Sequence, residues 1–164
     1  MIIQPPRTGV VFVCMGNICR SPTAEGVFRR LAERAGMLER IMVDSAGTHS
    51  YHVGLQPDPR AQAAAAQRGY DLSALRARQF SARDVMDFDY VLAMDSENLE
   101  EVRRLIPKDK YHKTQLFMNF STQHHGQDVP DPYYGSIDGF EQVLSMVEDA
   151  TAGLLAEIRK NLPA

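Results

Sequence analysis

The sequence predicts an α/β fold in which a parallel β-sheet is covered on both faces by helices. Short segments rich in β-branched and aromatic residues alternate along the chain with segments whose apolar residues recur every three or four positions. This alternation is typical of parallel sheets, because a helix usually forms the crossover between two parallel strands. The chain has 164 residues, which is enough for a hydrophobic core of its own. We therefore expect residues 1–164 to form a single domain.

The first expected unit is a buried strand over residues 9–13, a short loop, and a helix that starts near Pro22. Ser21 suits the N-cap of that helix, and Pro22 suits its first helical position. The apolar residues that follow have helical spacing: Ala24, Val27, Phe28, Leu31 and Ala35. A second strand is expected at residues 41–43. A helix over residues 58–68 should follow, because this segment is rich in alanine.

The second half of the chain continues the pattern. A helical turn at residues 82–86 precedes a third strand at residues 90–94, and Ser96 is expected to cap a helix that stops before Pro107. A fourth strand is expected at residues 113–117. A long final helix has one apolar face, made of Phe140, Val143, Leu144, Val147, Leu154, Leu155 and Ile158. The order predicts a flavodoxin-like domain that binds its ligand at the carboxyl end of the first strand.

Composition excludes several classes of function. Lys and Arg number 18 against 21 Asp and Glu, a formal charge of −3, so broad nucleic-acid binding is not expected. The N-terminal apolar run covers only residues 10–13, which is too short for a signal peptide or a membrane span. The two cysteines should then be reduced thiols in the cytoplasm. His124 and His125 have no further ligand at metal-binding spacing, so we expect no metal.

The loop after the first strand has the residues that an oxyanion site requires. Cys14 and Arg20 are six positions apart, Gly16 lies between them, and Ser21 follows. Backbone amides at a helix N-terminus and a planar guanidinium together suit a tetrahedral oxyanion. A nucleophilic cysteine must be ionised to a thiolate. Hydrogen bonds from the loop and from Ser21 can stabilise that thiolate. The alternative interpretation is a buried structural cysteine beside a surface arginine. The complete segment from Cys14 to Ser21 favours a site at which sulfur attacks phosphorus.

This string resembles the low-molecular-weight protein tyrosine phosphatases, and bacterial members in particular. The family signature is a cysteine, five residues, and an arginine followed by serine. Further segments match in the family's order and spacing and cover nearly the whole chain: residues 43–48, 57–61, 76–79, 88–95 and 129–135. The resemblance implies a three-layer fold with a four-stranded parallel sheet in the order 2-1-3-4. It also implies hydrolysis of phosphotyrosine without a cofactor.

The reaction needs a proton for the departing oxygen. Asp131 lies between two prolines that stiffen its backbone, and Asp128 and Asp95 are competing candidates. The resemblance gives the role to Asp131. In the implied scheme Cys14 attacks phosphorus while Asp131 protonates the phenolic oxygen. A phosphocysteine forms, and Asp131 then activates the water that hydrolyses it.

Aromatic side chains are expected around the entrance. Tyr51, Tyr133 and Tyr134 could pack against the ring of a phosphotyrosine while its phosphate reaches the cysteine. The two adjacent tyrosines have an alternative interpretation, as an exposed pair or a site of regulatory phosphorylation. The resemblance places the remaining loop residues around the phosphate: Met15, Gly16, Asn17, Ile18, Cys19 and Ser21.

The resemblance also implies a network that braces the loop through Asn17 and Ser45. Asparagine tolerates the left-handed backbone geometry that such a strained loop uses. Many relatives have a histidine at the position of Leu75, so the bracing here is expected to be weaker or arranged differently. Cys19 is either a small apolar loop residue or a redox partner for Cys14.

Two other functions are compatible with an oxyanion loop. An arsenate reductase needs further cysteines to pass oxidising equivalents onward, and none occurs after Cys19. A non-catalytic phosphate-binding module would not need both the thiol and the acid. The expected partner is a tyrosine-phosphorylated protein, such as a bacterial tyrosine kinase. The oligomeric state stays open between a monomer and a weak dimer.

Overall fold

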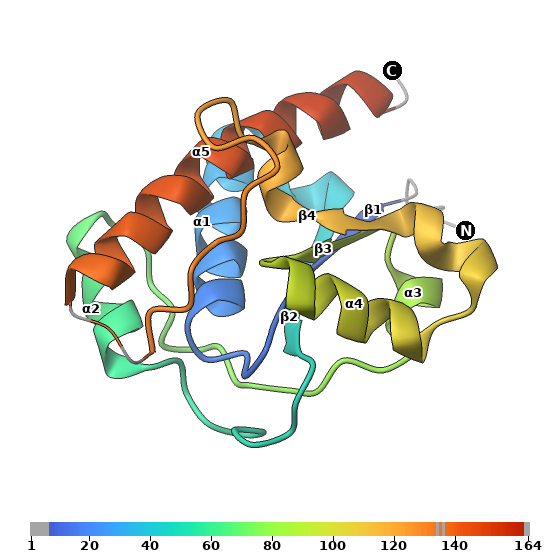
Figure 1. Ribbon diagram of the computed structural model, residues 1–164. Coiled ribbons are helices and arrows are strands. Elements are labelled where there is room, and N and C mark those ends of the chain that lie inside the picture. Colours follow the sequence, from blue (N-terminus) through green and yellow to red (C-terminus); the bar gives the residue numbers. More distant parts are fainter. Residues whose placement is uncertain (1–6, 134, 136, 163–164) are drawn as a thin grey trace, which may run out of the picture.

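A four-stranded parallel sheet in the order β2-β1-β3-β4 forms the centre of the computed structural model (Figure 1). The strands are β1 (Thr8–Cys14), β2 (Ile41–Gly47), β3 (Tyr90–Ala93) and β4 (Thr114–Leu116). The structure describes residues 7–133, 135 and 137–162. The parallel sheet and its order agree with the sequence-based expectation.

Helices cover both faces of this sheet, as predicted (Figure 1). One face packs against α1 (Arg20–Arg34) and α5 (Ile137–Asn161), and the other packs against α3 (Asp84–Asp87) and α4 (Ser96–Leu105). A further helix, α2 (Pro59–Gln67), packs against α1 and α5. Among the described residues there are also three short 3-10 helices: η1 (Leu38–Arg40), η2 (Lys108–Lys113) and η3 (Phe117–Phe120).

The central strand β1 joins two hydrophobic clusters because successive side chains of a strand point to opposite faces. Val10 and Phe12 are buried against α1 and α5, whereas Val11 and Val13 are buried against the face of α3 and α4. Burial of such a side chain contributes roughly 1.5–3 kcal/mol. The strand is therefore fixed on both sides, and so is its carboxyl end, where the loop with Cys14 begins.

Strand β2 is longer than the sequence predicts. It continues to Gly47 instead of ending at Val43, and its last residues pair in register with Phe12, Val13 and Cys14. Small residues such as Ser45 have little strand propensity of their own. Tertiary pairing with the buried central strand overrides that local preference. This extension brings Ser45 and Gly47 beside the loop.

Two helix caps differ from the sequence-based expectation. Helix α1 begins at Arg20 with Cys19 at the N-cap, so Ser21 lies inside the first turn. Its hydroxyl is oriented toward Cys14, an arrangement that local capping preference does not anticipate. Helix α4 is capped by Asp95, whose side chain accepts a hydrogen bond from the Asn98 amide over 2.7 Å.

Candidate active site

Cys14 is the last residue of β1, and groups of the following loop surround its sulfur. The amide of Asn17 donates a hydrogen bond to Sγ over 3.3 Å, and the Ser21 hydroxyl lies 3.0 Å from the same atom. These groups favour a negatively charged sulfur, because a hydrogen bond to a charged group contributes roughly 1.5–3 kcal/mol. The amino end of α1 adds a partial positive charge. The surroundings of Cys14 therefore suit a nucleophilic thiolate.

Asn17 connects this loop to neighbouring elements. It is the only non-glycine residue in the described part of the chain with a positive φ, 57°. Its Nδ2 donates to the hydroxyls of Ser21 and Ser45, over 2.7 and 3.0 Å. Its Oδ1 accepts a hydrogen bond from the Arg78 amide over 3.0 Å. The side chain thus holds the left-handed turn from both sides, which supports the bracing role of Asn17 and Ser45.

Glu25 continues the network, although sequence reasoning did not single it out. The Ser45 hydroxyl donates to Oε1 over 2.7 Å, and Arg29 Nε donates to Oε2 over 3.0 Å. Burial raises the pKa of Glu25 above its ordinary value. Leu75 is partly buried and packs against the hydrophobic core. In this chain the network around Asn17 and Ser45 therefore includes the buried carboxyl group of Glu25.

Gly47 allows the end of β2 to lie directly against the loop. A Cβ atom at this position would lie 2.7 Å from the carbonyl oxygen of Met15 and 3.0 Å from the carbonyl carbon of Gly16. Backbone atoms cannot rotate away as a flexible side chain can. The amides of Thr48 and His49 also donate to the carbonyls of Cys14 and Met15, over 2.9 and 3.0 Å.

Gly47→Ala is accordingly expected to displace the loop. Overpacking of this kind costs typically 1–3 kcal/mol, so the free energy of unfolding in urea should fall by about that amount, and any activity that depends on the loop should fall with it. Gly139→Ala is the matched control, because a Cβ there makes only ordinary contacts of 3.5 Å or more with Pro132. Equal stability and activity of the two variants would contradict this account of Gly47.

Arg20 is almost fully buried and is held from two sides. Its Nη1 donates to Asp95 Oδ2 over 2.5 Å and to the Val129 carbonyl over 3.0 Å. Its Nη2 lies 3.6 Å from Asp131 Oδ2. Burial by itself lowers the pKa of Arg20, but the negative charges of Cys14 and Asp95 outweigh this effect and raise that pKa. The guanidinium therefore stays charged beside the sulfur.

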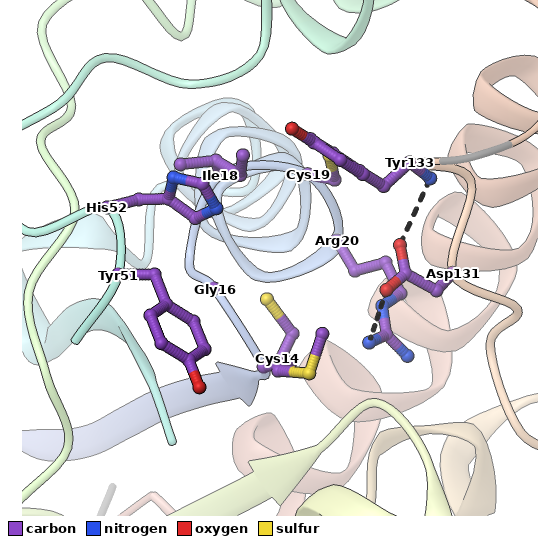
Figure 2. Close-up of a pocket in the computed structure, with 10 residues that line it drawn as sticks. Cys14, Gly16, Ile18, Cys19, Arg20, Tyr51, His52, Asp131 and Tyr133 are labelled. Carbon is purple, nitrogen blue, oxygen red and sulfur yellow. Dashed lines mark hydrogen bonds and ion pairs between the residues drawn. The ribbon is translucent and has the colours of Figure 1, made fainter. Parts of the chain in front are cut away.

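The three candidate acids lie in different places. Asp131 lines the pocket and points toward Arg20, as Figure 2 shows. Asp95 caps α4 and pairs with Arg20. Asp128 accepts hydrogen bonds from the amide and hydroxyl of Ser96, over 3.0 and 2.8 Å, and does not line the pocket. Asp131 is thus the candidate with access to a bound ligand.

The pocket has a volume of about 290 Å³ and lies over the sulfur of Cys14. Tyr51 and His52 lie on one side of it, whereas Asp131 and Tyr133 lie on the other (Figure 2). Tyr51 stacks on His49 with ring centroids 5.3 Å apart. His52, which the sequence analysis did not select, also lines the pocket. Its signal in the sequence was only its position next to Tyr51.

The structure brings together most of the residues that the sequence analysis selected. Those that line the pocket are Cys14, Met15, Gly16, Ile18, Cys19, Arg20, Tyr51, Asp131 and Tyr133. Those that are buried and do not line the pocket are Asn17, Ser21 and Ser45. Tyr134 lies outside the described residues.

Cys19 is a free thiol at the edge of the same pocket. Burial raises the pKa of Cys19 well above its ordinary value, and the carboxylate of Asp58 raises it further. The thiol therefore stays neutral, which suits a small apolar loop residue, and its redox role stays a prediction. No group of three or more potential ligand side chains within the described residues is arranged to hold a metal ion.

A thiol, an arginine and a carboxylate lie around one pocket at the carboxyl end of a parallel sheet, and these are the groups that a phosphatase acting through cysteine requires. The family model of the low molecular weight phosphotyrosine protein phosphatases matches residues 9–164. The chain therefore belongs to the low-molecular-weight phosphotyrosine protein phosphatase family, whose members are hydrolases.

Individual relatives agree with this assignment. A low molecular weight protein-tyrosine-phosphatase of Streptomyces coelicolor is 46% identical over 156 residues, which are 93% of this chain and 94% of that protein. The crystal structure of YfkJ from Bacillus subtilis has a TM-score of 0.91 at 36% identity, and covers 98% of this chain and 99% of that one. A protein tyrosine phosphatase from Entamoeba histolytica, crystallised with Hepes in its active site, has a TM-score of 0.90 at 37% identity, with 93% and 97% covered. These comparisons do not favour an arsenate reductase.

Proposed function

We propose that this protein hydrolyses phosphotyrosine in proteins through a phosphocysteine intermediate, with Cys14 as nucleophile, Arg20 as phosphate ligand and Asp131 as general acid and base. The observation that carries the proposal is that Arg20 donates one nitrogen to Asp95 and to the Val129 carbonyl, while the other lies 3.6 Å from Asp131 Oδ2 in the pocket that Cys14 also lines. A phosphoryl group bound above Cys14 would then contact the sulfur, the Arg20 guanidinium and the Asp131 carboxyl.

In the first step the Cys14 sulfur attacks phosphorus and the bond from phosphorus to the phenolic oxygen breaks. The guanidinium of Arg20 and the loop amides bind the equatorial oxygens and stabilise their charge. Protonated Asp131 donates its proton to the departing phenolate. In the second step the Asp131 carboxylate takes a proton from water, the water oxygen attacks phosphorus, and the sulfur leaves as a thiolate with release of phosphate.

The walls of the pocket support an aromatic substrate. Tyr51 is 75% exposed and Tyr133 is 37% exposed, and both line the pocket, so a ligand in the pocket can contact them. A phosphotyrosine ring packed between them would put its phosphate at the depth of Cys14, which a phosphoserine is too short to reach. Tyr134 is proposed as a further wall residue from the sequence pattern alone. We also propose that residues 1–164 act as one phosphatase domain.

Tyrosine-phosphorylated protein is the substrate class, and a bacterial tyrosine kinase that carries its own phosphotyrosine is the partner we propose. We further propose that the enzyme works in the cytoplasm, because Cys14 and Cys19 are free thiols and the nucleophile must stay reduced. A monomer or a weak dimer is the oligomeric state we propose. No helix in the described part of the chain has the length and apolar character needed to cross a bilayer.

The test compares phosphate release from matched phosphotyrosine and phosphoserine peptides, with EDTA present. The intact protein should act on the phosphotyrosine peptide only, and EDTA should have no effect. Inhibition by thiol alkylation should accompany this result. If the reduced protein released no phosphate from either peptide, the proposed activity would be wrong, and arsenate reduction with an external thiol would be tested next.

Tyr51→Ala tests the aromatic wall. Loss of one ring face is expected to raise KM for a phosphotyrosine peptide by about three- to tenfold, since aromatic pairs are worth roughly 0.5–1.5 kcal/mol beyond their buried area. Inhibition by inorganic phosphate, which has no ring, should not change. Val53→Ala is the control, because Val53 is exposed and does not line the pocket. Equal changes in KM for both variants would contradict the role of Tyr51.

A further inference from the structure

We infer that Arg60 is a positioning residue that couples the segment carrying the general acid to the loop that carries the nucleophile. The inference rests on the proposed function, in which Asp131 is the acid. Arg60 lies in the first turn of α2 and does not line the pocket. Its effect on the reaction would therefore be indirect, through the segment that contains Asp131 and Tyr133.

The guanidinium of Arg60 connects three separate parts of the chain. Its Nε and Nη2 donate to the two carboxylate oxygens of Asp58, over 3.1 and 2.9 Å. Nη2 also donates to the carbonyl of Tyr133 over 2.9 Å. Its flat face lies 4.7 Å from the centre of the Phe140 ring, near the start of α5. One side chain thus joins α2, the segment with the acid, and α5.

Asp58 links this cluster to the nucleophile loop. It is buried at the N-cap of α2, and its amide donates to the carbonyl of Ile18 over 2.8 Å. Burial by itself raises the pKa of Asp58, but hydrogen bonds from Arg60 lower it below its ordinary value, so the carboxylate stays charged. The contacts from Ile18 to Asp58, from Asp58 to Arg60 and from Arg60 to Tyr133 form a continuous connection.

Asp131 lies at the end of this connection. The Tyr133 amide donates to Asp131 Oδ1 over 3.1 Å (Figure 2), so the carboxyl follows the position of the Tyr133 backbone. The prolines on either side of Asp131 restrict the φ angles of the segment. A shift of the Tyr133 carbonyl would therefore move the acid relative to the sulfur. A general acid is sensitive to such a shift because proton transfer requires hydrogen-bond distance.

The test is the dependence of kcat/KM on the leaving group. Arg60→Gln and Asp131→Asn are compared with the intact protein on two aryl phosphates. Phenyl phosphate releases a phenol whose pKa is near the value of about 10 for tyrosine and needs a proton, whereas 2,4-dinitrophenyl phosphate releases a stable anion that does not. Arg60→Gln should lower kcat/KM by about tenfold on phenyl phosphate and less than about twofold on the dinitrophenyl ester. In an Asp131→Asn background, Arg60→Gln should cause no further loss.

Two controls separate positioning from a general structural role. Arg60→Lys keeps the charge but lacks the planar fork, so it should resemble Arg60→Gln. Arg83→Gln removes an arginine whose side chain is 85% exposed, and it should leave both rates unchanged. Competitive inhibition by inorganic phosphate should be the same in the intact protein and both Arg60 variants, which shows that the nucleophile loop is intact.

The inference is overturned by equal loss of kcat/KM on both esters in Arg60→Gln, by intact-like rates in Arg60→Lys, or by a further loss in the Asp131→Asn background. Failure of the proposed function looks different. In that case the intact protein would hydrolyse neither ester, or the kcat/KM of Asp131→Asn would fall by the same factor on both esters.

Discussion

Cys14→Ser is expected to lower kcat for a phosphotyrosine peptide by about 10⁴-fold or more, because a serine hydroxyl is not ionised in the environment that stabilises the thiolate. The hydrogen bonds from Asn17 and Ser21 that now reach sulfur would meet a neutral oxygen. Inorganic phosphate should still bind, since Arg20 and the loop amides are unchanged. Steady-state kinetics and calorimetric titration with phosphate measure the two effects.

A control for this substitution is the thermal unfolding midpoint, which should change little because serine is close to cysteine in size. A variant that is folded, binds phosphate and has lost turnover identifies the sulfur as the reacting atom. Turnover that survives the substitution in EDTA would contradict the assignment of Cys14.

Arg20→Lys should lower kcat/KM for the same peptide by about 10³-fold. The guanidinium of Arg20 donates one nitrogen to Asp95 and Val129 and leaves another for a phosphate oxygen. Lysine keeps the charge but has a single nitrogen, so it cannot make both sets of hydrogen bonds. Loss of one donor to a developing oxyanion costs about 10²- to 10³-fold, and the misplaced Asp95 carboxylate adds to the loss. The inhibition constant of inorganic phosphate should rise as well.

Arg83→Lys is the matched control for this prediction, because Arg83 is exposed and far from the pocket residues in sequence. It should have the kinetics of the intact protein. If Arg20→Lys retained kcat/KM within about threefold of the intact protein, a simple positive charge would be sufficient and the need for the separate donors of the guanidinium would be wrong.

The sequence was most informative where local pattern and burial agree. The strand that ends at Cys14 and the helix that contains Val27 and Phe28 could be predicted because both have strong periodicity and lie in the core. The parallel arrangement followed from their alternation with later elements. The strand order required the family resemblance, because periodicity does not specify which strands are neighbours.

The residues that sequence reasoning missed depend on contacts between distant segments. Glu25 looks like an ordinary helix surface residue until β2 extends to place Ser45 beside it. His52 becomes a pocket wall only through the path of its loop. Arg60 acquires a role only because the carbonyl of Tyr133, 73 positions later, reaches it. The caps of α1 and α4 differed from expectation for the same reason. The Ser21 hydroxyl contacts Cys14 and the Ser96 hydroxyl donates to Asp128, so neither caps its own helix.

The measurement that tests the central claim most directly is the capture of the phosphoenzyme. Asp131→Asn lacks the base for the second step, so with 2,4-dinitrophenyl phosphate the intermediate should form and accumulate. Rapid denaturation at alkaline pH followed by peptide mass spectrometry should find one phosphoryl group on the peptide that contains Cys14, and none when Cys14→Ser is added. Release of dinitrophenol without a phosphoryl group on Cys14, or with the group on another residue, would contradict the account.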